Sequence, residues 1–167
     1  MNDVKFKAAK ESDLGKMLEI YNYYIRTTTA NFYHHELSED EFRKVIFIGH
    51  KKYRTFLIYS ARQFVGFCFL TQYKNKEAFD RTAEIGVYIK SDSTSKGFGC
   101  SVVAFLEKQA VDSQIRVIIA SISGENSASI GLFKKMGYKK CAHYKAVGEK
   151  FGRFLDAVAF QKILLKK

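Results

Sequence analysis

The sequence has no proline, only three cysteines, and no apolar run of the roughly 18 residues that a membrane span needs. Cys68, Cys100 and Cys141 are odd in number and widely spaced, which fits neither a disulfide framework nor a zinc-binding pattern. We therefore expect a reduced, cytoplasmic protein without a metal site. The first residues lack the apolar segment of a signal peptide. A length of 167 residues predicts one domain, spanning 3–167.

Acidic residues are too few to balance the basic ones, and the net charge is +11. Such a charge is typical of proteins that bind nucleic acid, a membrane surface or an anionic ligand. The basic residues are spread along the chain, and no segment has the aromatic pattern of an RNA-binding motif. We expect no nucleic-acid or membrane partner. Two interpretations stay open, a solvated basic surface and a focused site for a polyanionic cofactor.

Hydrophobic periodicity predicts alternating strands and helices in the order βααβββαβαββ. Apolar residues make up 47% of the chain, enough for a substantial core. The order indicates an α/β or α+β protein, with a mixed sheet and helices on both faces. Ser38 and Glu41 form a capping box at the start of the second helix. The expected strands are 4–8, 55–61, 64–73, 82–89, 116–121, 139–147 and 154–164, and the expected helices are 14–25, 38–46, 101–111 and 126–136.

Two glycines, Gly97 and Gly99, stand with Lys96 between the apolar run 84–90 and the helical pattern 101–111. Glycine costs backbone entropy on folding, so its use here requires a compensating gain. A helix N-terminus binds phosphate, and glycines allow phosphate to approach the backbone closely. Val102 stands where a dinucleotide fingerprint has its third glycine. The loop thus predicts a pyrophosphate cradle, or else a tight strand-to-helix turn.

The segment ENSASIGLFKKMGY (125–138) gives this loop a context, since Asn126 can cap a helix that ends at Gly137. A strand, a Gly-x-Gly helix start, another strand and this Asn-containing helix together resemble the GNAT family of acetyl-CoA-dependent N-acetyltransferases. Three segments resemble its phosphinothricin and methionine sulfone acetyltransferase subgroup, namely IYNYYIRTTTANF (20–32), TAEIGVYI (82–89) and VGEKFGRFLDAVAFQ (147–161). The resemblance implies the GNAT fold, with a mixed, mostly antiparallel central sheet.

The resemblance implies that the amine of a small substrate attacks the acetyl thioester of acetyl-CoA. A protonated amine needs a base, directly or through water, and the resemblance gives that role to Glu84. A strand-edge salt bridge is the competing interpretation of Glu84. Asn126 is expected to bond the cofactor, to cap its helix, or to do both. The remaining cofactor contacts implied are the backbone of Val87, Tyr88 and Ile89 and the loop residues Ser95, Lys96, Gly97, Phe98, Gly99 and Cys100.

The sequence departs from the family pattern at two places. Thr94 and Ser95 stand where the family loop carries an Arg or Gln and another glycine, so one phosphate-binding cation is missing. Phe133 stands where a tyrosine or histidine usually lies near the leaving thiolate, and it cannot donate a proton. Tyr138, Tyr144 or water would have to protonate the thiolate, unless it leaves unprotonated.

The subgroup acts on amino-acid-like acceptors with an oxygen-rich tetrahedral side group, such as phosphinothricin, methionine sulfone or methionine sulfoximine. Its members carry arginines in the loop where this chain has Lys74 and Lys76. Lysine is a point charge and lacks the bidentate fork of arginine, so an anionic acceptor fits but specificity can differ. A solvated loop is the alternative for these lysines. The acceptor contacts implied are Tyr73, Lys74, Lys76, Phe79, Lys150 and Arg153.

Several weaker inferences complete the prediction. His34 and His35 are adjacent rather than at metal-ligand spacing. Cys100 lies at a helix start, which lowers a thiol's pKa, but a covalent acetyl-cysteine route is disfavoured. The resemblance implies a homodimer. Two other functions stay open, acetylation of a protein or peptide, and non-catalytic binding of acyl-CoA, which Thr94 and Phe133 favour.

Overall fold

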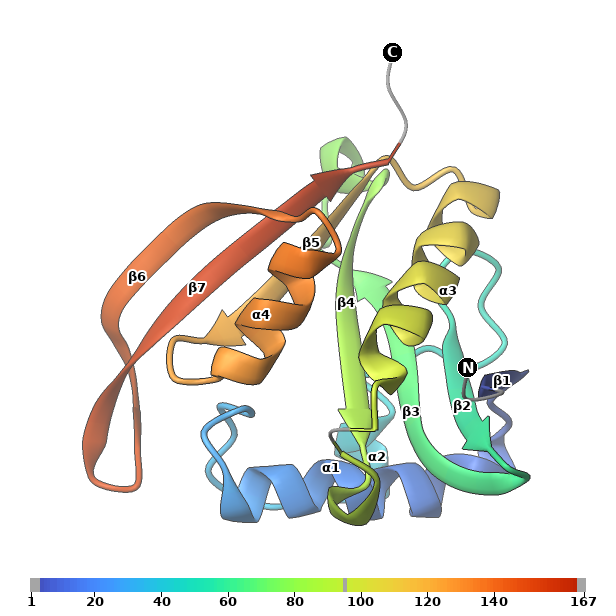
Figure 1. Cartoon of the computed structure of the whole chain (residues 1–167), viewed down its shortest axis with the longest axis horizontal. Coiled ribbons are helices and arrows are strands. Elements are labelled where there is room, and N and C mark those ends of the chain that lie inside the picture. Colours follow the sequence, from blue (N-terminus) through green and yellow to red (C-terminus); the bar gives the residue numbers. More distant parts are fainter. Residues whose placement is uncertain (1–3, 95, 165–167) are drawn as a thin grey trace.

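A computed structural model describes residues 4–94 and 96–164. A seven-stranded sheet has the order β1-β2-β3-β4-β5-β7-β6, and helices cover both of its faces (Figure 1). The strands are β1 (Val4–Ala8), β2 (Thr55–Ser60), β3 (Gln63–Gln72), β4 (Thr82–Ile89), β5 (Val117–Ser123), β6 (Lys139–Lys150) and β7 (Arg153–Ile163). The helices are α1 (Leu14–Thr27), α2 (Glu39–Phe42), α3 (Phe98–Asp112) and α4 (Ser127–Lys135).

The pairing of the strands is antiparallel throughout, except that β4 and β5 run parallel. The predicted class, a mixed and mostly antiparallel sheet with helices on both faces, is therefore confirmed. A parallel pair needs a crossover, and α3 supplies the one between β4 and β5. The predicted element order is also confirmed.

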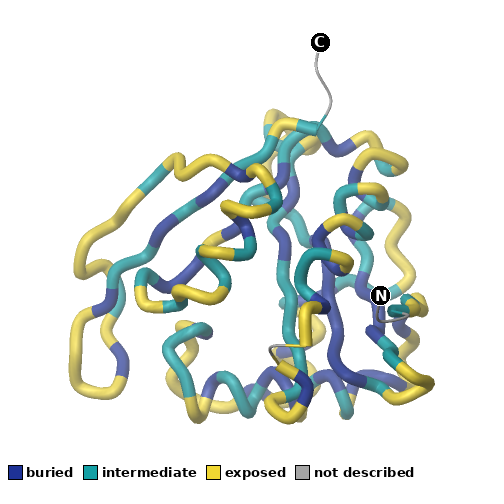
Figure 2. Tube along the Cα trace, viewed as in Figure 1, coloured by how far each residue is buried: buried dark blue, intermediate teal, exposed yellow. Residues whose placement is uncertain are grey.

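Alternation along the strands divides the core between the two faces of the sheet. Leu57, Phe67 and Phe69 pack with α1 and α2, whose Met17 and Phe42 are fully buried. On the other face Val102 and Leu106 of α3 lie in a cluster with residues of β4, β5 and α4. Burial of one such side chain stabilises the fold by about 1.5–3 kcal/mol. Strands β2 and β3 are consequently mostly dark in Figure 2, whereas the projecting β6–β7 hairpin is largely exposed.

Three local predictions need correction. The capping box of Ser38 and Glu41 is present, but α2 ends at Phe42 because the next residues form shorter-range hydrogen bonds, as from Val45 N–H to the Phe42 carbonyl. The β2–β3 turn lies at Ala61 and Arg62 rather than one residue later.

The third correction concerns the last hairpin, where β6 and β7 continue to Lys150 and Arg153 and leave a turn of Phe151 and Gly152. Both residues of this turn, like Ala61 and Arg62, have positive φ. Positive φ at both central residues gives a turn whose twist matches that of the strands. Among the described residues, no helix is long and apolar enough to cross a membrane.

Candidate functional site

A wedge opens between β4 and β5 in the middle of the sheet. The two strands pair only where residues 82–84 lie beside residues 117–119. Beyond Glu84 and Ile119 they part, while β4 stays paired with β3 and β5 with β7 (Figure 1). The sheet therefore continues on either side of a gap, and helix α1 runs past its open end.

The backbone of β4 turns hydrogen-bonding groups toward this wedge. Lys90 N–H bonds the Val65 carbonyl on the β3 side, and Val117 N–H bonds the Arg81 carbonyl on the β5 side. Because bonding alternates along a strand, Ile85, Val87 and Ile89 direct their backbone groups toward the wedge. β5 no longer pairs with β4 at this level. Tyr24 Oη donates to the Ile89 carbonyl at 2.7 Å, and the remaining groups of this edge are placed to bond a ligand.

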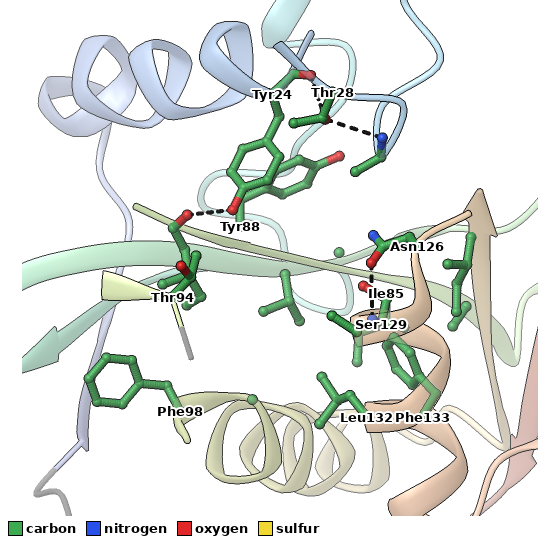
Figure 3. Close-up of a pocket in the computed structure, with 18 of the residues that line it drawn as sticks. Tyr24, Thr28, Ile85, Tyr88, Thr94, Phe98, Asn126, Ser129, Leu132 and Phe133 are labelled. Carbon is green, nitrogen blue, oxygen red and sulfur yellow. Dashed lines mark hydrogen bonds between the residues drawn. The ribbon is translucent and has the colours of Figure 1, made fainter. Parts of the chain in front are cut away.

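A cavity of about 610 Å³ occupies the wedge and the space beside it. Phe98, Leu132 and Phe133 lie along one wall, with Tyr24, Thr28 and Tyr88 opposite (Figure 3). Ser95 lies outside the described residues. The other residues predicted to contact a cofactor all line this cavity, namely Val87, Tyr88, Ile89, Lys96, Gly97, Phe98, Gly99, Cys100 and Asn126.

The two glycines of the loop serve different purposes. Gly97 caps α3 in the left-handed region, with φ of 81°, and no atom lies within 4 Å of the place where a Cβ would stand. At Gly99 a Cβ would lie only 2.8 Å from Leu132 Cδ2. Gly97 therefore supplies the turn and leaves open space, whereas Gly99 allows close packing of α3 against α4. The N-terminus of α3 faces the cavity and is suited to an anion.

Asn126 is both a helix cap and a wall of the cavity. Its Oδ1 accepts a hydrogen bond from Ser129 N–H at 3.0 Å, as a helix cap should (Figure 3). The capping bond uses the oxygen of the carboxamide and leaves its NH₂ group for a ligand. The capping prediction is confirmed, and it is compatible with a role in binding.

The tyrosines proposed as proton donors lie off the cavity. Tyr138 is buried, with its ring centroid 5.0 Å from that of Phe133. Burial raises the pKa of the Tyr138 hydroxyl. Tyr144 is exposed on β6. Tyr24 and Tyr88 do line the cavity, and burial raises the pKa of both, so they carry protons at neutral pH.

Glu84 lies at the apex of the wedge, half-buried, where β4 and β5 begin to part. Its Oε1 accepts a hydrogen bond from Ser121 Oγ. Ser121 lines the cavity, whereas Glu84 does not. The carboxylate thus reaches the cavity through a serine that comes from a different strand, and sequence reasoning did not single out that serine.

The predicted acceptor contacts in the β3–β4 connection form a cluster beyond the apex. The rings of Tyr73 and Phe79 are 5.7 Å apart, and Lys74 Nζ lies 5.1 and 5.3 Å from their centroids. Lys74 and Lys76 are exposed. None of these residues lines the cavity, although the connection leads into β4 two residues before Glu84.

Lys150 and Arg153 hold one wall of the cavity in place. Lys150 is 2% exposed, and its Nζ donates to the carbonyls of Thr28 at 2.9 Å and Asn31 at 2.7 Å. Burial lowers the pKa of the Lys150 ammonium. Arg153 pairs with Glu125, which accepts a hydrogen bond from Thr29 Oγ1 at 3.0 Å.

The loop that they fix, residues 28–31, contributes Thr28, Thr29 and Ala30 to the cavity wall. The sequence carried no local signal for this arrangement, because its partners are about 120 residues apart. Among residues 4–94 and 96–164, no group of His, Cys, Asp and Glu side chains could hold a metal ion.

A family model described as an acetyltransferase (GNAT) domain matches residues 6–159. The chain is 29% identical to phosphinothricin N-acetyltransferase of Alcaligenes faecalis over 164 residues, which covers 95% of this chain and 81% of that protein. It is also 29% identical to the L-methionine sulfoximine/L-methionine sulfone acetyltransferase of Pseudomonas aeruginosa over 154 residues, covering 90% and 88%. A solved acetyltransferase from Salmonella typhimurium with its cofactor acetyl-CoA has a TM-score of 0.87 at 26% identity, covering 99% of this chain and 96% of that chain.

Proposed function

Because the chain belongs to the GNAT family and is an acetyl-CoA-dependent N-acetyltransferase, we propose that it acetylates the amino group of a small amino-acid-like compound. The proposed acceptors are phosphinothricin, methionine sulfone and methionine sulfoximine. The observation that carries this choice is the 29% identity with the phosphinothricin enzyme, which extends over 95% of this chain. A relative named for methionine sulfoximine and methionine sulfone supports the same acceptor class.

The residues present in the wedge fit acetyl-CoA, which supplies an acetyl group activated as a thioester. We propose that the backbone of Val87 and Ile89 bonds the pantetheine arm, whereas the backbone of Tyr88 faces β3 and Tyr88 contributes only to the cavity wall. The N-terminus of α3 and the open space at Gly97 suit the pyrophosphate, because a helix N-terminus favours negative charge. With Thr94 in place of a cation, the backbone N–H groups carry most of this binding. The amide of Asn126 is proposed to bond the thioester end.

We propose that Glu84 is the general base. An amine is largely protonated at neutral pH, and a carboxylate beside the acetyl thioester can remove the proton that blocks its lone pair. The position of Glu84 at the wedge apex, bonded to a serine of the cavity wall, supports this role. Among the described residues, the carboxylate of Glu84 accepts a hydrogen bond from a hydroxyl group rather than pairing with a cation, which weighs against the alternative of a strand-edge salt bridge.

The acceptor side is proposed to be cationic and aromatic. Lys74 and Lys76 would attract the anionic side group of the acceptor, and Tyr73 and Phe79 would position Lys74. Arg153 is proposed to add a cationic contact. The contribution of Lys150 to acceptor binding is proposed to be indirect, since its ammonium group already bonds two loop carbonyls.

We further propose a cytoplasmic homodimer. The three cysteines are free, which is typical of a reducing compartment. The β6–β7 hairpin exposes large apolar side chains, with Phe154 at 70%, Val147 at 61% and Phe151 at 56% exposure. Burying them against a second copy would remove this apolar surface from water. Phe154→Asp should therefore yield a monomer by light scattering, and an unchanged mass would contradict a dimer through this hairpin.

The acceptor class is tested by measuring free thiol released from acetyl-CoA by the wild-type protein. The acceptors are phosphinothricin, methionine sulfone, methionine sulfoximine, unmodified methionine and short peptides. The proposal expects kcat/KM to be highest for an oxygen-rich acceptor and lower for methionine. Preferential turnover of a peptide would replace it with protein acetylation.

A further inference from the structure

We propose that Ser121 relays the proton of the acceptor amine to Glu84. The inference rests on the proposed function, because it takes Glu84 as the base. Two observations carry the inference. Ser121 is exposed and lines the cavity, whereas Glu84 is half-buried and does not line it. Ser121 Oγ donates a hydrogen bond to Glu84 Oε1. A group inside the cavity therefore meets the serine hydroxyl before it meets the carboxylate.

The register of the two strands explains how a residue on β5 comes to lie in this position. Glu84 is beside Ile119, the last point at which β4 and β5 pair. Side chains two residues apart on a strand point to the same face, so Ser121 stands on the face of Ile119, one step further into the opening. Its hydroxyl can therefore bridge the gap where the strands part. The neighbours of Glu84 in the ladder, Thr71 and Ile119, are not ionisable.

The relay moves protons without leaving a free alkoxide. The ammonium group of the acceptor gives one proton to Ser121 Oγ while the hydroxyl proton of Ser121 passes to Glu84 Oε1. The serine is regenerated as a hydroxyl, and Glu84 becomes a neutral carboxylic acid. The neutral amine then forms a C–N bond to the acetyl carbon as the C–S bond breaks. The electron pair of that bond leaves on sulfur, and the remaining extra proton leaves the nitrogen for solvent. Glu84 then releases its proton to solvent and returns to a carboxylate before the next turnover.

Ser121→Ala tests the relay, with Ser121→Thr as the variant that keeps a hydroxyl. Ser123→Ala is the matched control, since Ser123 lies on the same strand and face but is buried, off the cavity, and without a hydrogen-bond partner for its hydroxyl among the described residues. We expect Ser121→Ala to lower kcat by about 10- to 100-fold, with little change in the KM of either substrate. This loss is smaller than the roughly 10²- to 10⁴-fold contribution typical of general-base catalysis, because a water molecule can replace the missing hydroxyl. Ser121→Thr and Ser123→Ala should stay within about threefold of wild type.

The pH dependence separates a relay from a structural role. As the pH rises toward the pKa of the acceptor amine, solvent removes the proton and the relay is needed less. The ratio of wild-type to Ser121→Ala activity should therefore fall with rising pH, whereas a packing defect would keep it constant. A ratio that is constant, or that is one at every pH, would overturn the relay while leaving the proposed function intact.

A measurement made without any acceptor distinguishes failure of the relay from failure of the proposed function. The carboxyl carbon of Glu84, assigned with Glu84→Gln, should shift in the carbon NMR spectrum of Ser121→Ala and not in that of Ser123→Ala. Absence of turnover with every small acceptor would count against the proposed function. An unshifted carboxyl resonance would count against the relay whether or not an acceptor is turned over.

Discussion

The proposed cofactor side of the cavity consists largely of two stretches, 85–100 and 126–133, whereas the proposed acceptor side combines side chains from distant segments. On the proposed cofactor side the backbone would provide most of the binding, through the edge of β4 that β5 leaves beyond Glu84 and through the N-terminus of α3. On the proposed acceptor side, Ser121 bonds Glu84 and Lys150 bonds the loop 28–31, and the proposed chemistry depends on such contacts. Glycines and caps announce the first kind of site in the sequence, and only tertiary structure reveals the second.

The largest effect on stability is expected at Lys150. Lys150→Met leaves the carbonyls of Thr28 and Asn31 without their donor, and a buried polar group left unsatisfied costs about 1–3 kcal/mol. Thermal or denaturant unfolding should show that loss, and KM for the acceptor should rise more than KM for acetyl-CoA because the loop 28–31 loosens.

Lys162→Met is the matched control, since Lys162 bonds Glu107 and the Met136 carbonyl away from the loop. It should lower stability without changing the ratio of the two KM values. Equal changes of that ratio in both variants would show that acceptor binding does not depend on the hydrogen bonds from Lys150 to the loop 28–31.

Gly97→Ala probes the cofactor side. Alanine at a φ of 81° costs about 1–2 kcal/mol of strain. Its methyl group would also enter the open space of the cradle, so the Kd for acetyl-CoA should rise about tenfold by calorimetry, which corresponds to about 1.4 kcal/mol. Gly49→Ala shares the strain, with φ of 73° and open space, but lies off the cavity. An equal loss of affinity in both variants would mean that Gly97 acts only through stability.

The sequence predicted the proposed cofactor side better than the proposed acceptor side, because the first depends on local patterns and the second on long-range contacts. The strand 82–89 was predicted with the bounds that it has, because its apolar alternation and flanking turns are local signals. The cap at Asn126 and the turn at Gly97 were predicted for the same reason. Ala61 and Arg62 form a turn without its usual glycine or asparagine, so the turn was placed one residue late.

The contacts of the proposed acceptor side could not be predicted from local sequence patterns. Lys150 resembled a cationic acceptor contact, yet it lies buried beneath a loop that is about 120 residues away in sequence. Ser121 is one of several small residues in an apolar strand, and only the parting of β4 from β5 distinguishes it. The positions of Lys150 and Ser121 both depend on which distant segments the fold brings together. No local pattern in the sequence shows that.

A smaller effect concerns pH. Burial lowers the pKa of Lys150 from its usual 10.5, so between the lowered pKa and 10.5 the unfolded chain holds more protons than the folded one. Stability contributed by Lys150 should thus rise with pH in that window, because the cost of burying a charge disappears. The difference in unfolding free energy between wild type and Lys150→Met should widen as pH approaches 10.5. A difference that narrows would contradict the lowered pKa.

The smallest effect is expected at the exposed lysines of the β3–β4 connection. Lys74→Ala removes a cation that lies over two rings, an interaction worth about 0.5–1 kcal/mol at exposed sites. We expect kcat/KM for an anionic acceptor to fall about two- to fivefold, with no change for acetyl-CoA. Lys108→Ala removes the same charge from an exposed position on α3. A matching fall in that variant would reduce the role of Lys74 to general electrostatics.

The central claim is that Glu84 acts in catalysis and other residues bind acetyl-CoA. Glu84→Gln tests this claim most directly, with kcat and the Kd for acetyl-CoA measured on the same preparation. The account predicts that kcat falls by about 10²- to 10⁴-fold, as expected for loss of a general base, while the Kd stays within about twofold of wild type. Undiminished kcat, or a loss of acetyl-CoA affinity as large as the loss of kcat, would contradict it.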